Sequence, residues 1–421
     1  MNYRRDETGR IPELRLVITL LVICLVSLLT RAAYGATGGY STPGTLHGNG
    51  LPTVDPKAHL EVRATYLWAD SNFDGSVKTE HDIIKSAVIP ELNLQLRLSD
   101  NWWLDTRVFC PFGAGTHYDE YWQGAFHLVD AGLETINITP GLLWSNCNLA
   151  VRVAPQVQLM RRVGFSQAMF LPGIIGEIDG GDAWGFGAHL SVAYKPWERT
   201  EFSLGYWSRI VHNLNDGKVE ASFWSLANLS LGGTKIEATT PDVLAAKVQY
   251  DINNSWSVWG LVEYSLWSDV LDELRVQFDS PFLPDHTVQY DSKDTWFFQV
   301  GAYWDSEDNP WSLLASVGWG SCFTADANRH PSLIGGETWN LNVETRYTWS
   351  SGISAFLGGK WVKWEEGISE LQGASIPYGF PYGTIFGQLQ GDYHASVLRI
   401  ETGVSIPFRN QGSNKRNTKK L

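Results

Sequence analysis

Residues 393–408 read YHASVLRIETGVSIPF and alternate between apolar and polar side chains. Leu398 and Ile400 fall on one face, and Arg399 and Glu401 fall on the other. A period of two is typical of a β-strand, because successive side chains of a strand point to opposite faces. An apolar face beside lipid and a polar face beside water predict the closing strand of a membrane-spanning barrel.

The same alternation recurs upstream, from His59 onward. Leucines alternate with polar residues in Glu91–Ser99, and Asn148–Arg161 repeats the pattern. We count about fourteen such strands, joined by short turns that alternate with long loops. The fold class predicted is all-β: a transmembrane antiparallel up-and-down β-barrel. A large soluble sandwich is the alternative, but sandwiches lack this alternation of short turns and long loops. Short turns belong in the periplasm, and an even strand number returns both ends of the barrel there.

The composition agrees with a barrel. The chain has 421 residues, 13% of them aromatic, with 20 Trp and 41 Gly, and its mean hydropathy is −0.17. Middling hydropathy spread over the chain fits alternating strands better than membrane helices. The net charge of −13 argues against nucleic acid as a partner.

The amino-terminal region carries the only long apolar run, Leu16–Thr30, which four arginines precede and small residues follow. The run is shorter than the roughly 20 residues of a spanning helix, so we interpret it as a signal peptide cleaved after Gly35. An uncleaved anchor is the alternative. The chain is therefore divided into a signal peptide (1–35), a short Gly- and Pro-rich plug or hatch (36–57), the barrel (58–408) and a basic periplasmic tail (409–421).

The polar faces of the predicted strands would look into the lumen and carry charges of both signs. A lumen of one sign would indicate an ion-selective pore, whereas a mixture indicates pairing across the lumen or with a plug. A role in binding a ligand carboxylate stays open for one of the arginines. The predicted lumen arginines are Arg63, Arg97, Arg107, Arg152, Arg346 and Arg399.

Two predicted extracellular loops, Arg162–Gly181 and Asp216–Thr240, are unusually apolar. Loops normally meet water, so their apolar residues either pack on each other as a lid or form a groove for an apolar ligand. The predicted groove residues are Phe165, Phe170, Leu171, Ile174, Ile175, Phe223, Trp224 and Leu226.

The sequence contains no catalytic or metal-binding constellation. There is no His-x-x-x-His pair, no Gly-x-Ser-x-Gly elbow and no phosphate-binding glycine loop. Cys24 would leave with the signal peptide, and the remaining Cys110, Cys147 and Cys322 have unrelated spacings. We therefore predict a non-enzyme without cofactor or metal. A lipase would need a Ser–His pair at adjacent lipid-facing strand ends.

Several ordered stretches resemble the FadL/TodX family of outer-membrane transporters for long-chain fatty acids and other hydrophobic compounds. Phe109–Tyr118 (FCPFGAGTHY) with Trp122-Gln123-Gly124 resembles the family's Pro-Phe-Gly … Trp-x-Gly segment. Gly181–Arg209 resembles its Gly-Asp-x-Trp-Gly-Phe-Gly hairpin. Further blocks follow in the same order, at Thr239–Val243, Trp267-Ser268, Leu274–Phe278 and Lys293–Trp296. The resemblance runs from about Leu60 to Phe408.

The resemblance implies a monomeric fourteen-stranded barrel with an amino-terminal hatch, a hydrophobic groove between the third and fourth extracellular loops, and a kink in the third strand that opens the wall sideways. Pro111 and Gly113 stand where that kink would be, and their chemistry agrees: Pro removes a ladder donor and Gly tolerates a bend. One departure is the hatch. The family's hatch is about twice as long and ends in Asn-Pro-Ala, whereas this chain has Asp55-Pro56-Lys57.

We therefore predict an outer-membrane channel of Gram-negative type for passive uptake of hydrophobic small molecules, long-chain fatty acids first among them. Its surroundings would be outer-membrane lipid and lipopolysaccharide. A general diffusion porin for polar solutes is the alternative, which the short hatch and the charged lumen favour.

Overall fold

A computed structural model describes residues 58–408 of this chain, except 170–172, 224–226, 281–282, 284, 307, 325–328 and 373–387. The predicted signal peptide (1–35), hatch (36–57) and basic tail (409–421) lie outside the described residues. No helix in the described ranges is long and apolar enough to cross a membrane.

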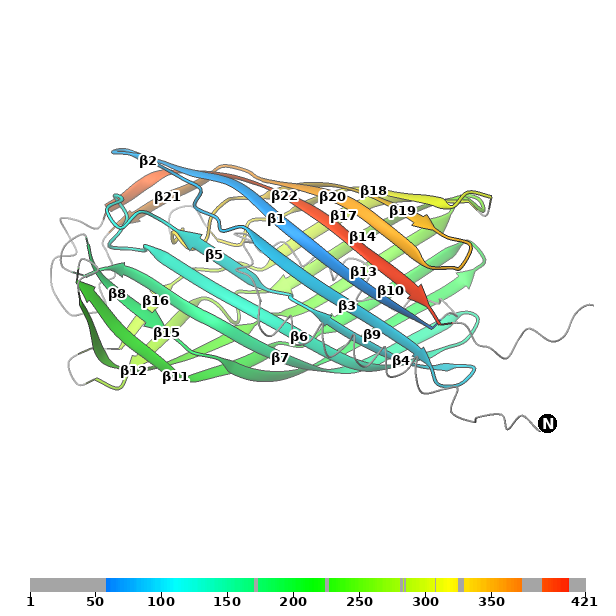
Figure 1. Ribbon diagram of the computed structural model, residues 1–421, viewed down its shortest axis with the longest axis horizontal. Coiled ribbons are helices and arrows are strands. Elements are labelled where there is room, and N and C mark those ends of the chain that lie inside the picture. Colours follow the sequence, from blue (N-terminus) through cyan, green and yellow to red (C-terminus); the bar gives the residue numbers. More distant parts are fainter. Residues whose placement is uncertain are drawn as a thin grey trace, which may run out of the picture. The chain divides into compact units, whose positions relative to one another are not determined.

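The described chain forms a closed antiparallel barrel of fourteen wall strands, as the sequence predicts (Figure 1). Closure depends on one pair: the first strand meets the last over its whole length, from His59 opposite Pro407 to Gly75 opposite Gly391. In ring order the wall strands are β1 (His59–Gly75), β3 (Ala87–Arg97), β4 (Trp102–Phe109), β6 (Asp130–Ser145), β7 (Leu149–Ala168), β9 (Ala183–Trp197), β10 (Thr200–Trp207), β13 (Asp242–Asp251), β14 (Trp256–Leu266), β17 (Thr295–Asp305), β18 (Trp311–Gly320), β19 (Thr338–Thr348), β20 (Ser354–Trp364) and β22 (Gln388–Pro407).

The alternation that predicted β22 is confirmed by the burial of its side chains. Ile400 and Val404 point outward and are 43% and 40% exposed, whereas Arg399 points inward and is 5% exposed. Residues on the outer face would contact lipid, and all backbone groups of a closed ladder are paired within the sheet. The same sequence pattern therefore satisfies both solvents of the barrel wall.

Eight further strands extend the wall beyond one end, the left end in Figure 1, where the long connections lie. By the rule that long connections are extracellular, this is the outer end. Five of these strands join β6 and β7 in a continuous ladder in the order β6–β7–β8–β11–β12–β15–β16, and β5 pairs with the other edge of β6. The extension strands are β2 (Thr79–His81), β5 (Gly113–His117), β8 (Ile174–Asp179), β11 (Ile210–Phe223), β12 (Ala227–Thr240), β15 (Glu273–Phe278), β16 (His286–Gln289) and β21 (Gly367–Gln372).

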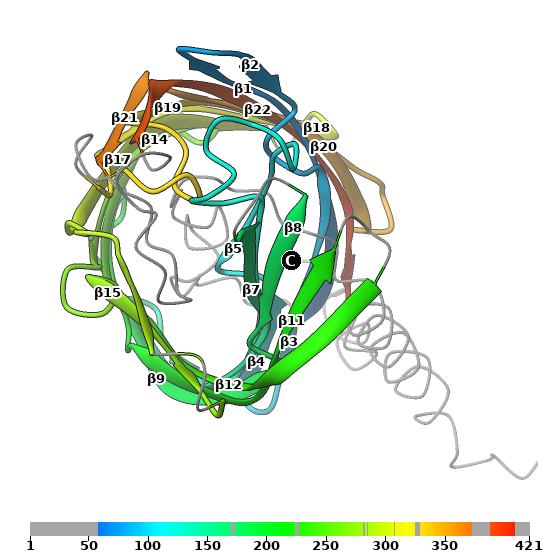
Figure 2. The same cartoon turned by 90° about the vertical axis from the view of Figure 1, so that its left-hand side faces the viewer.

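The two apolar segments predicted as loops are therefore mostly strands, and that part of the prediction is wrong. Segment 162–181 consists largely of the end of β7 and of β8, and segment 216–240 of most of β11 and of β12. Figure 2 looks into the outer end, where β8, β11 and β12 lie on one side of the mouth, away from β1, β2 and β22. Within the described residues, β8 is paired on both edges, whereas β12 is paired to β11 along its length and to β15 only at Thr234–Ile236.

Candidate functional site

The inner face of the extension carries one apolar cluster, which we call the ribbon cluster. Its members come from strands far apart in sequence because β8 pairs with both β7 and β11, from Lys218 opposite Asp179 to Phe223 opposite Ile174. Its buried residues are Met160, Val163, Met169, Ile174, Ile178, Ala183, Leu214, Val219, Ala221, Ile236, Ala238, Leu274, Val276 and Val288.

Three predicted groove residues meet at this cluster. Ile174 is a buried member, and Phe165 and Phe223 pack against it while partly exposed. Ile175 is also buried, but it follows Ile174 on β8 and does not belong to the cluster. The other four, Phe170, Leu171, Trp224 and Leu226, lie outside the described residues. Packing of the two segments on each other thus accounts for much of their apolar character. Phe165 and Phe223 are among the residues that pack against the cluster while remaining partly exposed.

A pair of glycines on β9 allows β11 to approach the wall closely. Gly185 and Gly187 face inward on β9, since their neighbours Trp184 and Phe186 are exposed on the outer face. A Cβ at Gly185 would lie 2.4 Å from Ile210 Cγ2 and only 2.8 Å from the carbonyl oxygen of Val211. Glycine is therefore required for β11 to leave the wall here and run on to β8.

The third wall strand is interrupted at the predicted kink. Phe109 pairs with Asn137 and Gly113 pairs with Glu134, so residues 110–112 of this strand face only Thr135 and Ile136 of β6. One extra residue on one strand is a β-bulge, and Pro111 suits it because proline has no N–H to leave unpaired. The Phe112 backbone is held by Thr135: its N–H donates to Thr135 Oγ1 (2.9 Å), and its carbonyl accepts from Thr135 N–H (3.0 Å).

The other edge of the bulge faces β3, and the two strands are not hydrogen-bonded to each other there. The β3–β4 ladder ends at Leu92 opposite Val108. Contact with the strand resumes only beyond β3, where Ile84 bridges Thr116. Within the described ladders, residues 87–91 pair with β1 alone. We call this stretch, 87–91 facing 109–112, the unpaired interval. It lies where the resemblance places a lateral opening.

The lumen arginines on the β4 side share a single carboxylate. Asp105 accepts from Arg107 Nε (2.9 Å) and from Arg152 Nε (2.8 Å), and also from Gln95 Nε2 (2.7 Å). Arg152 contacts His189 as well, whose ring stacks on Trp207. Among the described residues the Arg107 Nη1 group is buried and has no hydrogen-bond partner. Two guanidinium groups against one carboxylate leave this part of the lumen with surplus positive charge.

The arginines near the β1–β22 closure are balanced instead. Arg63 donates to Glu401 (2.6 Å) and Glu344 (3.1 Å), and Arg346 contacts Glu61 (3.3 Å). Both guanidinium groups also lie over the Phe356 ring. The charges on this part of the inner face therefore pair with one another along the wall, between β1, β22 and β19.

The last two predicted lumen arginines differ in depth. Arg399 is buried on the inner face of β22. Arg97 is exposed at the short-turn end, where it pairs with Asp100 (3.0 Å) and bonds the Ser99 carbonyl. Arg97 therefore belongs to the periplasmic rim rather than to the interior.

The loop after β5 folds over part of the mouth. Tyr118 stacks on Trp122 with 4.0 Å between ring centroids and donates to the Pro331 carbonyl (2.7 Å), which ties loop 118–129 to loop 321–337. Burial holds the pKa of Tyr118 well above its ordinary value, so the hydroxyl stays a donor. The edge of Trp122 meets Phe73 of β1. The mouth is thus covered on this side, and the ribbon cluster lies on another.

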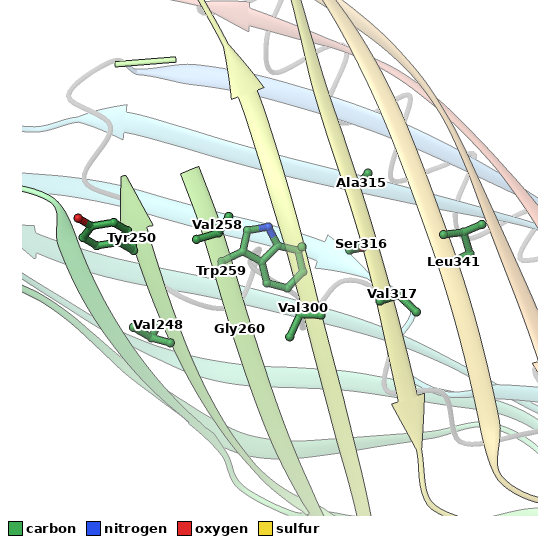
Figure 3. Close-up of a pocket in the computed structure, with 11 residues that line it drawn as sticks. Val248, Tyr250, Val258, Trp259, Gly260, Val300, Ala315, Ser316, Val317 and Leu341 are labelled. Atoms are coloured by element: carbon green, nitrogen blue, oxygen red, sulfur yellow. The ribbon is translucent and has the colours of Figure 1, made fainter. Parts of the chain in front are cut away.

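A depression of about 630 Å³ lies outside the lumen, on the outer face of β13, β14, β17, β18 and β19 (Figure 3). Its lining includes the outward-facing Val248, Tyr250, Val300 and Leu341, which are 42–59% exposed. In a membrane these side chains face lipid, so the depression is no part of a route through the lumen. No group of three or more metal-ligating side chains is found within the described residues.

The sequence did not identify two residues that hold the bulge or contact it, Phe112 and Thr135. Phe112 lies between the two predicted kink residues, yet its ring packs against Trp267 of a distant strand end. The Pro-Phe-Gly segment of the resemblance was the one available signal, and it marks the position without the contact. Thr135 carried no signal at all.

Comparison with known proteins agrees with this geometry. The family model of outer membrane protein transport proteins (OMPP1/FadL/TodX) matches residues 47–350. A Pseudomonas aeruginosa FadL homologue of known structure shares 15% identity, covers 89% of this chain and 98% of its own, and has a TM-score of 0.74.

Two further solved structures are similar. The CymD monoaromatic hydrocarbon channel shares 17% identity over 90% of this chain and 95% of its own, with a TM-score of 0.60. The P. putida toluene transporter TodX shares 14% identity over 88% and 94%, with a TM-score of 0.62. At these identities the structures establish the fold. No curated protein matches the sequence.

Proposed function

The chain belongs to the OMPP1/FadL/TodX family of outer-membrane transport proteins, and on that premise we propose that it admits hydrophobic small molecules by passive diffusion, with long-chain fatty acids as its cargo. Ligand would adsorb at the ribbon cluster, pass into the lumen and leave sideways through the unpaired interval. The protein would act as a monomer surrounded by lipid and lipopolysaccharide.

The observation that carries this proposal is the position of an apolar cluster at the outer mouth. Burial of each methylene is favourable by about 0.8 kcal/mol, so five methylenes against Phe165 and Phe223 would gain about 4 kcal/mol. That gain corresponds to a dissociation constant of about 1 mM. Binding of this strength captures a chain from water and still releases it inward without an energy source.

The choice of a fatty acid over a neutral hydrocarbon rests on the charges beside Asp105. Neutral aromatics are the rival cargo, because a toluene transporter and a monoaromatic hydrocarbon channel share this fold. An alkane or arene would gain nothing from a guanidinium group, whereas a carboxylate would pair with Arg107 Nη1. The surplus positive charge therefore supports an acidic headgroup.

The experiment compares uptake of labelled oleate by cells that carry wild type or a Phe165→Asp, Phe223→Asp double variant. A carboxylate at each partly exposed ring should abolish capture, because an apolar chain cannot pair with it. Asn228→Asp, Ser230→Asp is the matched control, since it adds the same two charges at exposed positions of β12 outside the ribbon cluster. Unchanged uptake by the double variant at normal surface expression removes the cluster from the mechanism.

A second comparison separates acid from neutral cargo. Arg107→Met leaves the Arg152–Asp105 pair balanced, so we expect the barrel to form normally. The variant should retain less oleate than wild type on detergent-purified protein and the same amount of toluene. Equal loss of both ligands would refute the role of Arg107.

A general diffusion porin for polar solutes remains the second candidate, and the charged lumen favours it. Planar-bilayer conductance distinguishes the two. A steady, large ohmic current in wild type indicates a porin, whereas near silence indicates the hydrophobic channel.

A further inference from the structure

A second apolar cluster lies beside the ribbon cluster and meets it at Tyr290, and we call it the aromatic clamp. Trp267, Phe323 and Leu333 are its buried members, and Phe112 and Tyr290 pack against them. The ring of Trp267 meets Phe112 edge-to-face, with centroids 5.6 Å apart at 83°, and meets Phe323 in the same manner at 5.1 Å and 86°. Trp267 thus joins rings from three different segments.

These segments belong to opposite sides of the barrel. Phe112 lies in the bulge between β4 and β5, Trp267 follows β14, and Phe323 follows β18. In the ring of paired strands, β4 is separated from β14 by β6, β7, β9, β10 and β13. The contact between Phe112 and Trp267 therefore reaches across the interior rather than along the wall.

The clamp also connects the two parts of the proposed route. Tyr290 packs against the ribbon cluster as well as against the clamp. Phe112 sits in the bulge that borders the unpaired interval. Apolar side chains therefore form a continuous series from the mouth to the interrupted wall, and within it the Phe112–Trp267 contact joins two sides of the barrel.

We propose that the aromatic clamp is a gate whose moving part is Phe112, and that its aperture sets the cross-section of the ligands this protein transports. The inference rests on the proposed function and names the specificity determinant of the same route. In the closed arrangement the Phe112 ring fills the space against Trp267. A ligand passes when that ring leaves the clamp.

The backbone around Phe112 suits such a motion. Its strand is anchored to β6 through Thr135 but has no ladder bonds to β3 over the unpaired interval. A segment held along one edge can rock about that edge without breaking a sheet. Trp267 and Phe323, by contrast, are 6% and 4% exposed and form the fixed side of the gate.

The test removes each side of the gate in turn. Phe112→Ala and Trp267→Ala should both raise uptake of a bulky pyrene-labelled fatty acid severalfold relative to oleate, since either truncation widens the same contact. Phe298→Ala is the matched control, because it deletes an aromatic ring on the outer face of β17, where Phe298 is 45% exposed. Surface expression and heat-modifiable migration confirm that each variant has formed a barrel.

Ionic conductance in planar bilayers gives a readout that needs no ligand. Both clamp variants should conduct more than wild type, and Phe298→Ala should not. If wild type takes up no oleate but both clamp variants gain conductance, the gate stands and the fatty-acid function falls. If wild type transports oleate and neither clamp variant changes the pyrene-to-oleate ratio or the conductance, the gate is refuted and the function stands. Where Phe112→Ala fails to fold, Phe112→Leu replaces it.

Discussion

Gly185→Ala tests whether the close approach of β11 to β9 positions the ribbon cluster. The added methyl carbon would lie 2.4 Å from Ile210 Cγ2 and 2.8 Å from His212 Nε2. The Ile210 side chain can rotate away from the new methyl group. The Val211 carbonyl oxygen, 2.8 Å from that group, belongs to the backbone, so relief of this contact requires that β11 itself moves. Overpacking of this kind costs typically about 1–3 kcal/mol. We therefore expect a loss of about 2 kcal/mol, which is roughly a thirtyfold change in the unfolding equilibrium.

Urea unfolding of the refolded barrel in phospholipid vesicles measures this loss. With a slope of about 3 kcal/mol per molar urea, the midpoint should fall by about 0.7 M. Gly359→Ala is the control, because nothing lies within 4 Å of a Cβ at that wall position. Oleate uptake by Gly185→Ala should also fall, because a shift of β11 displaces its residues in the ribbon cluster. A midpoint equal to that of Gly359→Ala would show that β11 does not press on Gly185.

Two other changes probe the lumen and the mouth. Asp105→Asn leaves the buried Arg107 and Arg152 without their carboxylate, and removal of one partner from a buried pair costs about 3–5 kcal/mol; an unfolding midpoint like that of wild type would mean that the charges are solvated. Tyr118→Phe deletes the bond to Pro331, worth about 0.5–1.5 kcal/mol, and should speed proteolysis within loop 321–337 on intact cells. Equal cleavage rates in both proteins would contradict an anchoring role for Tyr118.

The barrel wall was predictable because each wall strand faces two solvents. Period-two alternation in 393–408 depends only on local geometry, and Ile400 and Arg399 show the outward and inward positions that it predicts. The even number of strands predicted that both ends of the barrel lie on the same side, and the β1–β22 pair closes it. No long-range information was required, since consecutive wall strands pair in sequence order around the ring.

The sequence did not predict β11 and β12 as strands because their alternation of apolar and polar residues is interrupted. The β11–β12 ladder shifts register between Leu214 and Gly217 and again between Val219 and Glu220. Each bulge inserts an extra residue, so a strand that passes through it changes phase and loses its period of two. Segment 216–240 therefore shows apolar residues without alternation, which indicates a loop by sequence and a bulged strand in three dimensions.

For the candidate site, the sequence indicated local backbone features but not contacts between distant strands. Pro111 and Gly113 mark the interruption of the third strand, since their backbone chemistry is local. The partner of Phe112 is not local: Trp267 lies across the barrel and more than a third of the chain away. Arg107 and Arg152 were both predicted to face the lumen, but their shared dependence on Asp105 is a matter of register between strands.

The relative heights of these features favour a sideways exit over an axial one. Cys110, where the bulge begins, lies three residues beyond Arg107, a rise of about 10 Å along a strand. An apolar chain that continued straight down would have to displace the buried hydrogen bonds around Asp105, and each buried polar group left without a partner costs about 1–3 kcal/mol. A chain that turned at Phe112 would meet no described ladder bond between residues 87–91 and 109–112 and would enter lipid of its own polarity. If the proposed route holds, the hydrogen-bonded network around Asp105 would raise the free energy of the axial path, and the unpaired interval would lower that of the lateral one.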